Sequence, residues 1–179
     1  QTFLPTAIKF HYSFTLRDLS NVFQGVMFSN GAVIKTPIDF VRMLIHECSR
    51  VYGDKMIEKK DIDTFNNLKL EVFTKAFEEL PGEELAAEPN LFCHFALGIG
   101  EPKYAPVASW QKINEVLVEA LEAYNEVNAA MDLVLFEDAM SNVLRINRIL
   151  ESPRGNALLV GVGGSGKQSL SRLAASISG

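Results

Sequence analysis

The feature that most constrains this sequence is one glycine-rich run: Gly161-Val162-Gly163-Gly164-Ser165-Gly166-Lys167-Gln168. It nearly fits the phosphate-binding loop pattern G-x-x-x-x-G-K-[ST], with an apolar run before it and an amphipathic segment after it. Glycines let the backbone close around a phosphate with its amides pointing inward, and the following helix adds the positive end of its dipole. Lys167 adds a positive charge for the outer phosphates. The pattern therefore predicts a buried strand at 157–160, a nucleotide-binding loop and a helix that begins within 166–169.

One position departs from this pattern. Gln168 stands where a serine or threonine hydroxyl normally ligates Mg²⁺. Ser169 follows, but it is rotated by about 100° around the helix axis, because a helix has about 3.6 residues per turn. Two interpretations stay open: a site that binds ATP or ADP and hydrolyses slowly or not at all, or a Gln168 that reaches the metal through a water molecule.

Composition excludes several classes of function. The chain has 179 residues, of which 47% are hydrophobic, so it can bury a core. Its net charge is -5 and its basic residues are scattered, which argues against a nucleic-acid surface. The sequence contains no apolar run long enough to cross a bilayer. Cys48 and Cys93 lie far apart in apolar runs and are expected to be buried thiols.

Apolar spacing predicts a mainly α-helical fold. Two helix starts are well marked: Thr15-Leu16-Arg17-Asp18 reads as a capping box, and Thr36-Pro37-Ile38-Asp39 places proline at the first helical position. Helices are expected at about 16–27, 37–52, 61–80, 107–128 and 137–150. Between them, residues 81–107 hold four prolines and three glycines. This segment is predicted to be a loop with one short strand or helical turn, and a hinge between two units.

Beyond these patterns, three stretches carry a family resemblance. The stretch from His11 to Ser20 resembles the start of an AAA+ lid in dynein heavy chains. The stretches from Phe136 to Leu150 and from Pro153 to Gln168 are similar to the entry of the fourth AAA+ module of axonemal dynein heavy chains. The resemblance implies that residues 1–105 are the helical lid subdomain of the third module. It also implies that residues 106–179 are a connector helix and the first β-α unit of the next module.

The same resemblance implies nucleotide-binding residues outside the loop. Arg17 takes the position of the sensor-2 arginine, which in AAA+ proteins points from the lid towards the phosphates of its own module. Its alternative is a surface arginine paired with Asp18 or with solvent. Val134 and Leu135 take positions beside the adenine, although a plain link between helices fits them as well. Ser169 completes the set at the start of the helix, and the implied ligands are ATP or ADP, with Mg²⁺ in the parent motor.

The function implied by the resemblance is mechanical coupling within an ATP-driven, minus-end-directed microtubule motor of cilia and flagella. The implied partners are the microtubule, the neighbouring AAA+ modules, and dynein intermediate and light chains, with no nucleic acid and no membrane. The implied location is the cytoplasm, cytoskeleton and axoneme. The segment alone is expected to be inactive. Two alternatives are a P-loop enzyme of another kind, such as a small kinase, and a structural helical adaptor without a nucleotide role.

Overall fold

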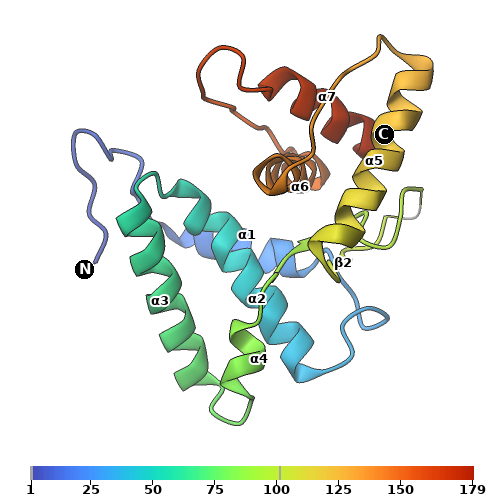
Figure 1. Cartoon of the computed structure of the whole chain (residues 1–179). Helices are drawn as coiled ribbons and strands as arrows, with labels where there is room; N and C mark the ends of the chain where they lie inside the picture. Colours follow the sequence, from blue (N-terminus) through green and yellow to red (C-terminus); the bar gives the residue numbers. More distant parts are fainter. Residues whose placement is uncertain (1, 101) are drawn as a thin grey trace. The chain divides into compact units, whose positions relative to one another are not determined.

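The computed structural model describes residues 2–100 and 102–179. These residues form two compact units, 1–91 and 92–179, and each is described by itself. Figure 1 shows that helices make up most of both units, as the sequence predicts. Within the described residues, the only sheet is a two-stranded antiparallel pair.

In the described residues of the first unit, every regular element is a helix. Its elements are α1 (Leu16–Val26), α2 (Pro37–Val51), the short 3₁₀ helix η1 (Gly53–Lys55), α3 (Lys59–Ala76) and α4 (Gly82–Ala86). Both predicted helix starts are confirmed, because Thr15 and Thr36 each form a capping box with the aspartate three residues later. The Asp39 amide donates to Thr36 Oγ1 at 3.2 Å, and the Thr36 amide donates back to the Asp39 carboxylate at 3.1 Å.

A small apolar core joins α2, α3 and α4. Val41, Ile45 and Leu85 are at most 2% exposed. Four partly buried residues pack against them: Ile38, Phe73, Phe77 and Leu80. The rings of Phe73 and Phe77 stack with their planes 8° apart. The end of α3 was predicted near residue 80, but the helix ends at Ala76. The chain then turns into α4, which agrees with the short strand or helical turn expected within 81–107.

The second unit contains β1 (Phe92–Cys93), β2 (Ala105–Pro106), α5 (Trp110–Val127), α6 (Glu137–Glu151) and α7 (Lys167–Ser178). Helix α7 packs against both α5 and α6. The core of this unit includes Leu117 from α5, Val143 from α6 and Leu173 from α7, each 0% exposed. These contacts bury the apolar faces that the spacing predicted for the three helices.

The structure corrects one prediction, the buried strand at 157–160. These residues lie in irregular backbone, and Leu158 and Val160 are 90% and 88% exposed. A β-strand needs a neighbouring strand to accept and donate its backbone hydrogen bonds, and no described residue pairs with this run. Residues 157–160 are apolar, as the prediction assumed, but an apolar run becomes a strand only where another strand pairs with it.

Candidate phosphate-binding loop and lid

The glycine-rich run forms a closed loop that leads directly into α7. Gly164 and Gly166 adopt positive φ angles of 76° and 71°, which glycine reaches without strain. Gly166 is the residue before the helix, and no side chain caps the first turn. The first amides of α7 therefore lack a side-chain acceptor, as expected where a helix start binds an anion.

The side chain of Lys167, the first residue of α7, folds back onto this loop. Its Nζ donates hydrogen bonds to the carbonyl oxygens of Gly161 at 2.8 Å and Val162 at 2.6 Å. It also donates to Ser165 Oγ at 3.0 Å. The ammonium group thus gathers three oxygen atoms from the loop around itself. Figure 1 shows the chain between α6 and α7 leading into the red helix α7.

Gly161 lies close to side chains of the same loop. A Cβ added at this position would lie 3.2 Å from Ser165 Oγ and 3.6 Å from both Cδ and Nζ of Lys167. Gly163 differs, since nothing lies within 4 Å of an added Cβ there. The nearest atoms are the ends of flexible side chains, so close approach constrains Gly161 only mildly, while the loop is open at Gly163.

These residues fit a nucleotide phosphate. The loop supplies a lysine charge, positive-φ glycines and an uncapped helix start, which together suit a multiply charged anion. A bound phosphate would compete with the loop carbonyls for Lys167, because both accept hydrogen bonds from Nζ. Gln168 is exposed and Ser169 is half-buried at the start of α7. A neutral amide at Gln168 suits a Mg²⁺ ion less well than the hydroxyl of the usual pattern.

The predicted adenine-side residues lie in the link between α5 and α6. Val134 is 75% exposed and Leu135 is half-buried. Two asparagines of α5 hold the link. Asn114 Nδ2 donates to the Leu135 carbonyl at 3.4 Å, and the Asn125 side chain bonds both the carbonyl and the amide of Met131. The Met131 amide donates to Asn125 Oδ1 at 2.8 Å. Neither asparagine was predicted, and the only signal in the sequence is a polar residue near each end of an amphipathic helix.

In the first unit, Arg17 lies exposed in the first turn of α1. Its neighbour Asp18 binds Lys55, whose Nζ lies 2.7 Å from the carboxylate. Burial alone would raise the pKa of the Asp18 carboxyl, but the hydrogen bonds from Lys55 and Thr15 outweigh it, so the pKa is lowered. The ion pair thus fixes the capped start of α1, beside Arg17.

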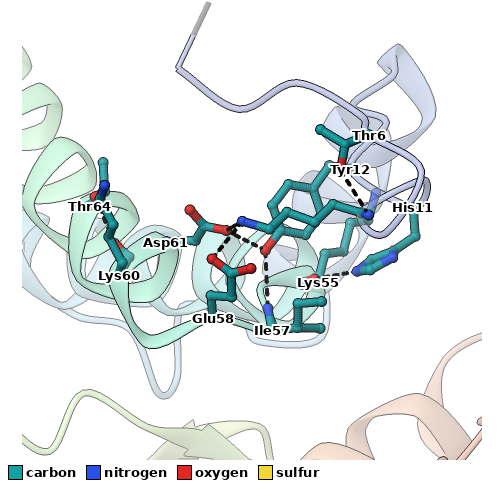
Figure 2. A network of polar contacts seen from close by, with 10 residues as sticks. Thr6, His11, Tyr12, Lys55, Ile57, Glu58, Lys60, Asp61 and Thr64 are labelled. Atoms are coloured by element: carbon teal, nitrogen blue, oxygen red, sulfur yellow. Dashed lines mark hydrogen bonds and ion pairs between the residues drawn. The ribbon is translucent and has the colours of Figure 1, made fainter.

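Figure 2 shows the polar network that fastens the segment before α1. Lys9 Nζ lies 2.6 Å from the Asp61 carboxylate and 2.8 Å from that of Glu58. The Tyr12 hydroxyl donates to Asp61 at 2.8 Å and accepts from the Ile57 amide at 3.1 Å. Tyr12 is only 2% exposed. The network joins the chain before α1 to the start of α3, so the entry to the lid is held at a defined place.

Other site types find no support in the parts of the chain that the structure describes. In residues 2–100 and 102–179, no group of histidine, cysteine and acidic side chains could hold a metal ion. Over the same ranges, every helix is too short or too polar to span a membrane. Cys48 and Cys93 are both free thiols.

Comparison with known protein families matches both parts of the chain. The AAA+ lid domain matches residues 1–87, and the P-loop containing dynein motor region D4 matches residues 131–179. The D4 match covers the loop and α7, and the lid match covers the four α-helices of the first unit up to Ala87. The two structural units thus each carry one family match.

Curated proteins give the same result at higher identity. The ciliary dynein beta chain of Heliocidaris crassispina is 66% identical over 178 residues, which is 99% of this chain and 4% of that protein. Dynein axonemal heavy chain 17 of Homo sapiens is 65% identical over 178 residues, again 99% of this chain and 4% of the relative. The flagellar outer arm dynein alpha chain of Chlamydomonas reinhardtii is 48% identical over 183 residues, 100% of this chain and 4% of the relative. The chain thus spans about one twenty-fifth of the length of these relatives. A lid match, a D4 match and nearly unbroken alignment to these proteins argue against a small kinase: over nearly its whole length, the chain is similar to one segment of axonemal dynein heavy chains.

Proposed function

We propose that this chain links two neighbouring modules of an ATP-driven, minus-end-directed microtubule motor in the axoneme of cilia or flagella. Residues 1–105 would be the lid of the third AAA+ module, and residues 106–179 the first part of the fourth. The relatives' names support the motor and its ciliary location. The lid would change orientation with the nucleotide state of its own module and pass that movement along the chain.

One observation carries the nucleotide part of this proposal: the loop leads without a side-chain cap into α7, with the Lys167 side chain folded back onto it. The residues proposed to hold the phosphates of ATP or ADP are Gly161, Val162, Gly163, Gly164, Ser165, Gly166, Lys167, Gln168 and Ser169. Lys167 would exchange its loop acceptors for phosphate oxygens, and the first amides of α7 would donate to the same phosphates. Val134 and Leu135 would border the adenine.

Arg17 would serve a different nucleotide, the one bound to the large subdomain of the lid's own module. Its exposed position leaves the guanidinium able to reach a partner outside this unit. An arginine always carries its charge and donates several hydrogen bonds, so phosphate occupancy can bias the lid angle through it. The Asp18–Lys55 ion pair supports this role, because it fixes the helix turn that carries Arg17.

The proposed partners follow from the family. The heavy chain would bind the microtubule and dynein intermediate and light chains, while this segment would contact the neighbouring AAA+ modules of the same chain. Mg²⁺ at the fourth-module loop is proposed to be weakly held, because Gln168 replaces the usual hydroxyl.

A nucleotide titration tests the loop. Fluorescent ADP is titrated into the chain, into Lys167→Ala and into the control Lys112→Ala, whose exposed lysine on α5 pairs with Glu115 at 3.1 Å. We expect Lys167→Ala to weaken binding by at least about tenfold, since a hydrogen bond to a charged group is worth roughly 1.5–3 kcal/mol. Lys112→Ala should bind as the unmodified chain does. Equal affinity in all three proteins would refute the proposed phosphate site.

A further inference from the structure

Helix α2 has a polar side that contacts the last residues of the first unit. Arg42 Nη1 donates to the carbonyl of Glu84, and its Nη2 donates to the carbonyl of Pro89 at 3.3 Å. Glu84 belongs to α4, and Pro89 lies beyond it, two residues before the unit ends at Leu91. The Arg42 guanidinium therefore contacts both α4 and the segment that follows it, near the last residue of the first unit.

A second pair of hydrogen bonds reinforces this contact. His46 Nδ1 lies 3.1 Å from the carbonyl of Asn90, and because a carbonyl only accepts, Nδ1 carries the proton. Asn90 Nδ2 in turn donates to the carbonyl of Arg42 at 3.0 Å. His46 is only 2% exposed. Its buried N–H group would be costly to leave without an acceptor, so the Asn90 carbonyl is tied to this place.

The apolar core holds the same segment from another side of α2. Leu85, at 1% exposure, packs with Val41 and Ile45, which come from the same helix as Arg42 and His46. Residues 84–90 are thus attached to α2 through both apolar packing and side-chain hydrogen bonds. The stretch 81–107, expected to be a hinge between two units, does contain the boundary between them at 91–92, but its first part is attached to α2.

We propose that Arg42 and His46 anchor residues 84–90 to α2, so that the lid and the chain that leaves it move as one body. Helix α2 then sets the direction in which the chain leaves the first unit, and the proline-containing segment up to residue 90 does not bend freely. This inference rests on the proposed coupling role, because a lid that passes movement onward needs a stiff exit. Arg42 and His46 act here as positioning residues, through the backbone of the exit segment.

Hydrogen–deuterium exchange of the chain without nucleotide tests the anchor. In Arg42→Met, the amides of residues 84–91 should exchange about tenfold faster, since two side-chain hydrogen bonds to the backbone are lost. The amides in the middle of α2 should keep their protection. The matched control is Lys75→Met, which removes an exposed cation of α3 paired with Glu71 at 2.6 Å. This control should leave the exit segment unchanged.

Asn90→Ala provides a second variant that leaves the apolar core intact. It removes only the hydrogen bond to the Arg42 carbonyl, so a rise in exchange confined to residues 84–91 supports the anchor. Unchanged exchange in both Arg42→Met and Asn90→Ala overturns it. A uniform rise over the whole first unit in both variants also overturns it, because the contacts would then serve general stability. No nucleotide is present, so this result stands apart from the titration of the phosphate loop.

Discussion

Leu85 gives the sharpest test of the fold of the first unit, because it lies in α4, for which the sequence indicated only a short strand or helical turn somewhere within 81–107. It is 1% exposed and packs with Val41 and Ile45. Leu85→Ala removes three carbon atoms, worth roughly 2.4 kcal/mol at about 0.8 kcal/mol each. The cavity left behind adds to this, so we expect a total loss of about 3 kcal/mol in the free energy of unfolding.

Urea unfolding followed by two probes measures the effect. Trp110 is the only tryptophan in the sequence and belongs to the second unit, so its fluorescence reports on that unit. Far-UV circular dichroism reports on the helices of both units. With a slope of about 2 kcal/mol per molar urea, the first-unit transition should move down by about 1.5 M. The Trp110 transition should stay in place.

Leu16→Ala is the matched control, since Leu16 is 85% exposed on α1. It makes the same chemical change without a cavity, so the free energy of unfolding should change by less than about 0.5 kcal/mol. The reasoning is refuted if Leu85→Ala and Leu16→Ala cost the same, or if Leu85→Ala costs less than about 1 kcal/mol. In either case α4 would not complete the core of the first unit.

Three further outcomes are expected. Hydrogen bonds from Lys9 and then from Tyr12 hold the pKa of the Asp61 carboxyl below its ordinary value of 3.8. The ionised Asp61 carboxylate therefore stabilises the folded chain above pH 3.8, and this stabilisation is lost as the pH falls through the lowered pKa. Thermal unfolding against pH should therefore show a smaller acid-induced loss in Asp61→Asn, and an unchanged profile would contradict the network. Burial raises the pKa of Cys48 to about 11 and that of Cys93 to about 12. Both native thiols should thus react slowly with a thiol reagent near neutral pH and rapidly in urea, and fast native labelling would show that the units open. Finally, Gln168→Ser should make nucleotide affinity depend more strongly on Mg²⁺ in a titration with and without chelator, whereas a strong Mg²⁺ dependence already present in the unmodified chain would argue against the weak-metal proposal.

Local chemistry made several features readable from the sequence. The capping boxes at Thr15 and Thr36 need only residues three positions apart, so their geometry follows from the local chain. The glycines at Gly164 and Gly166 supply positive φ angles within one loop, and the helix after them needs only its own apolar spacing. These predictions succeeded because each depends on neighbours within about one helical turn.

Other features depended on residues far apart in the sequence. Helix α4 has a suitable start, with Pro81 before it and two glutamates in its first turn, but five residues are too few for a stable isolated helix. The burial of Leu85 against α2 stabilises it. Asp18 was paired with its neighbour Arg17 as the local alternative, but Lys55, 37 positions away, binds it. Helix propensity and adjacent charges cannot anticipate such pairings, because only the packed helices bring these groups together.

The sequence by itself determined the mainly helical class, the helix starts and the glycine-rich turn before α7, since local backbone preference and apolar period specify each of them. Only the tertiary structure decided where the exit segment goes and whether an apolar run becomes a strand. Residues 157–160 are apolar enough for a buried strand, yet Leu158 is 90% exposed, because strand formation needs backbone partners. Residues 84–90 belong to the stretch expected to be a hinge, and the two units do divide within that stretch, at 91–92, yet Arg42 and His46 hold the carbonyls of Pro89 and Asn90. In both cases the outcome depends on hydrogen-bond partners from elsewhere in the chain, which hold residues 84–90 and which no described residue supplies to 157–160.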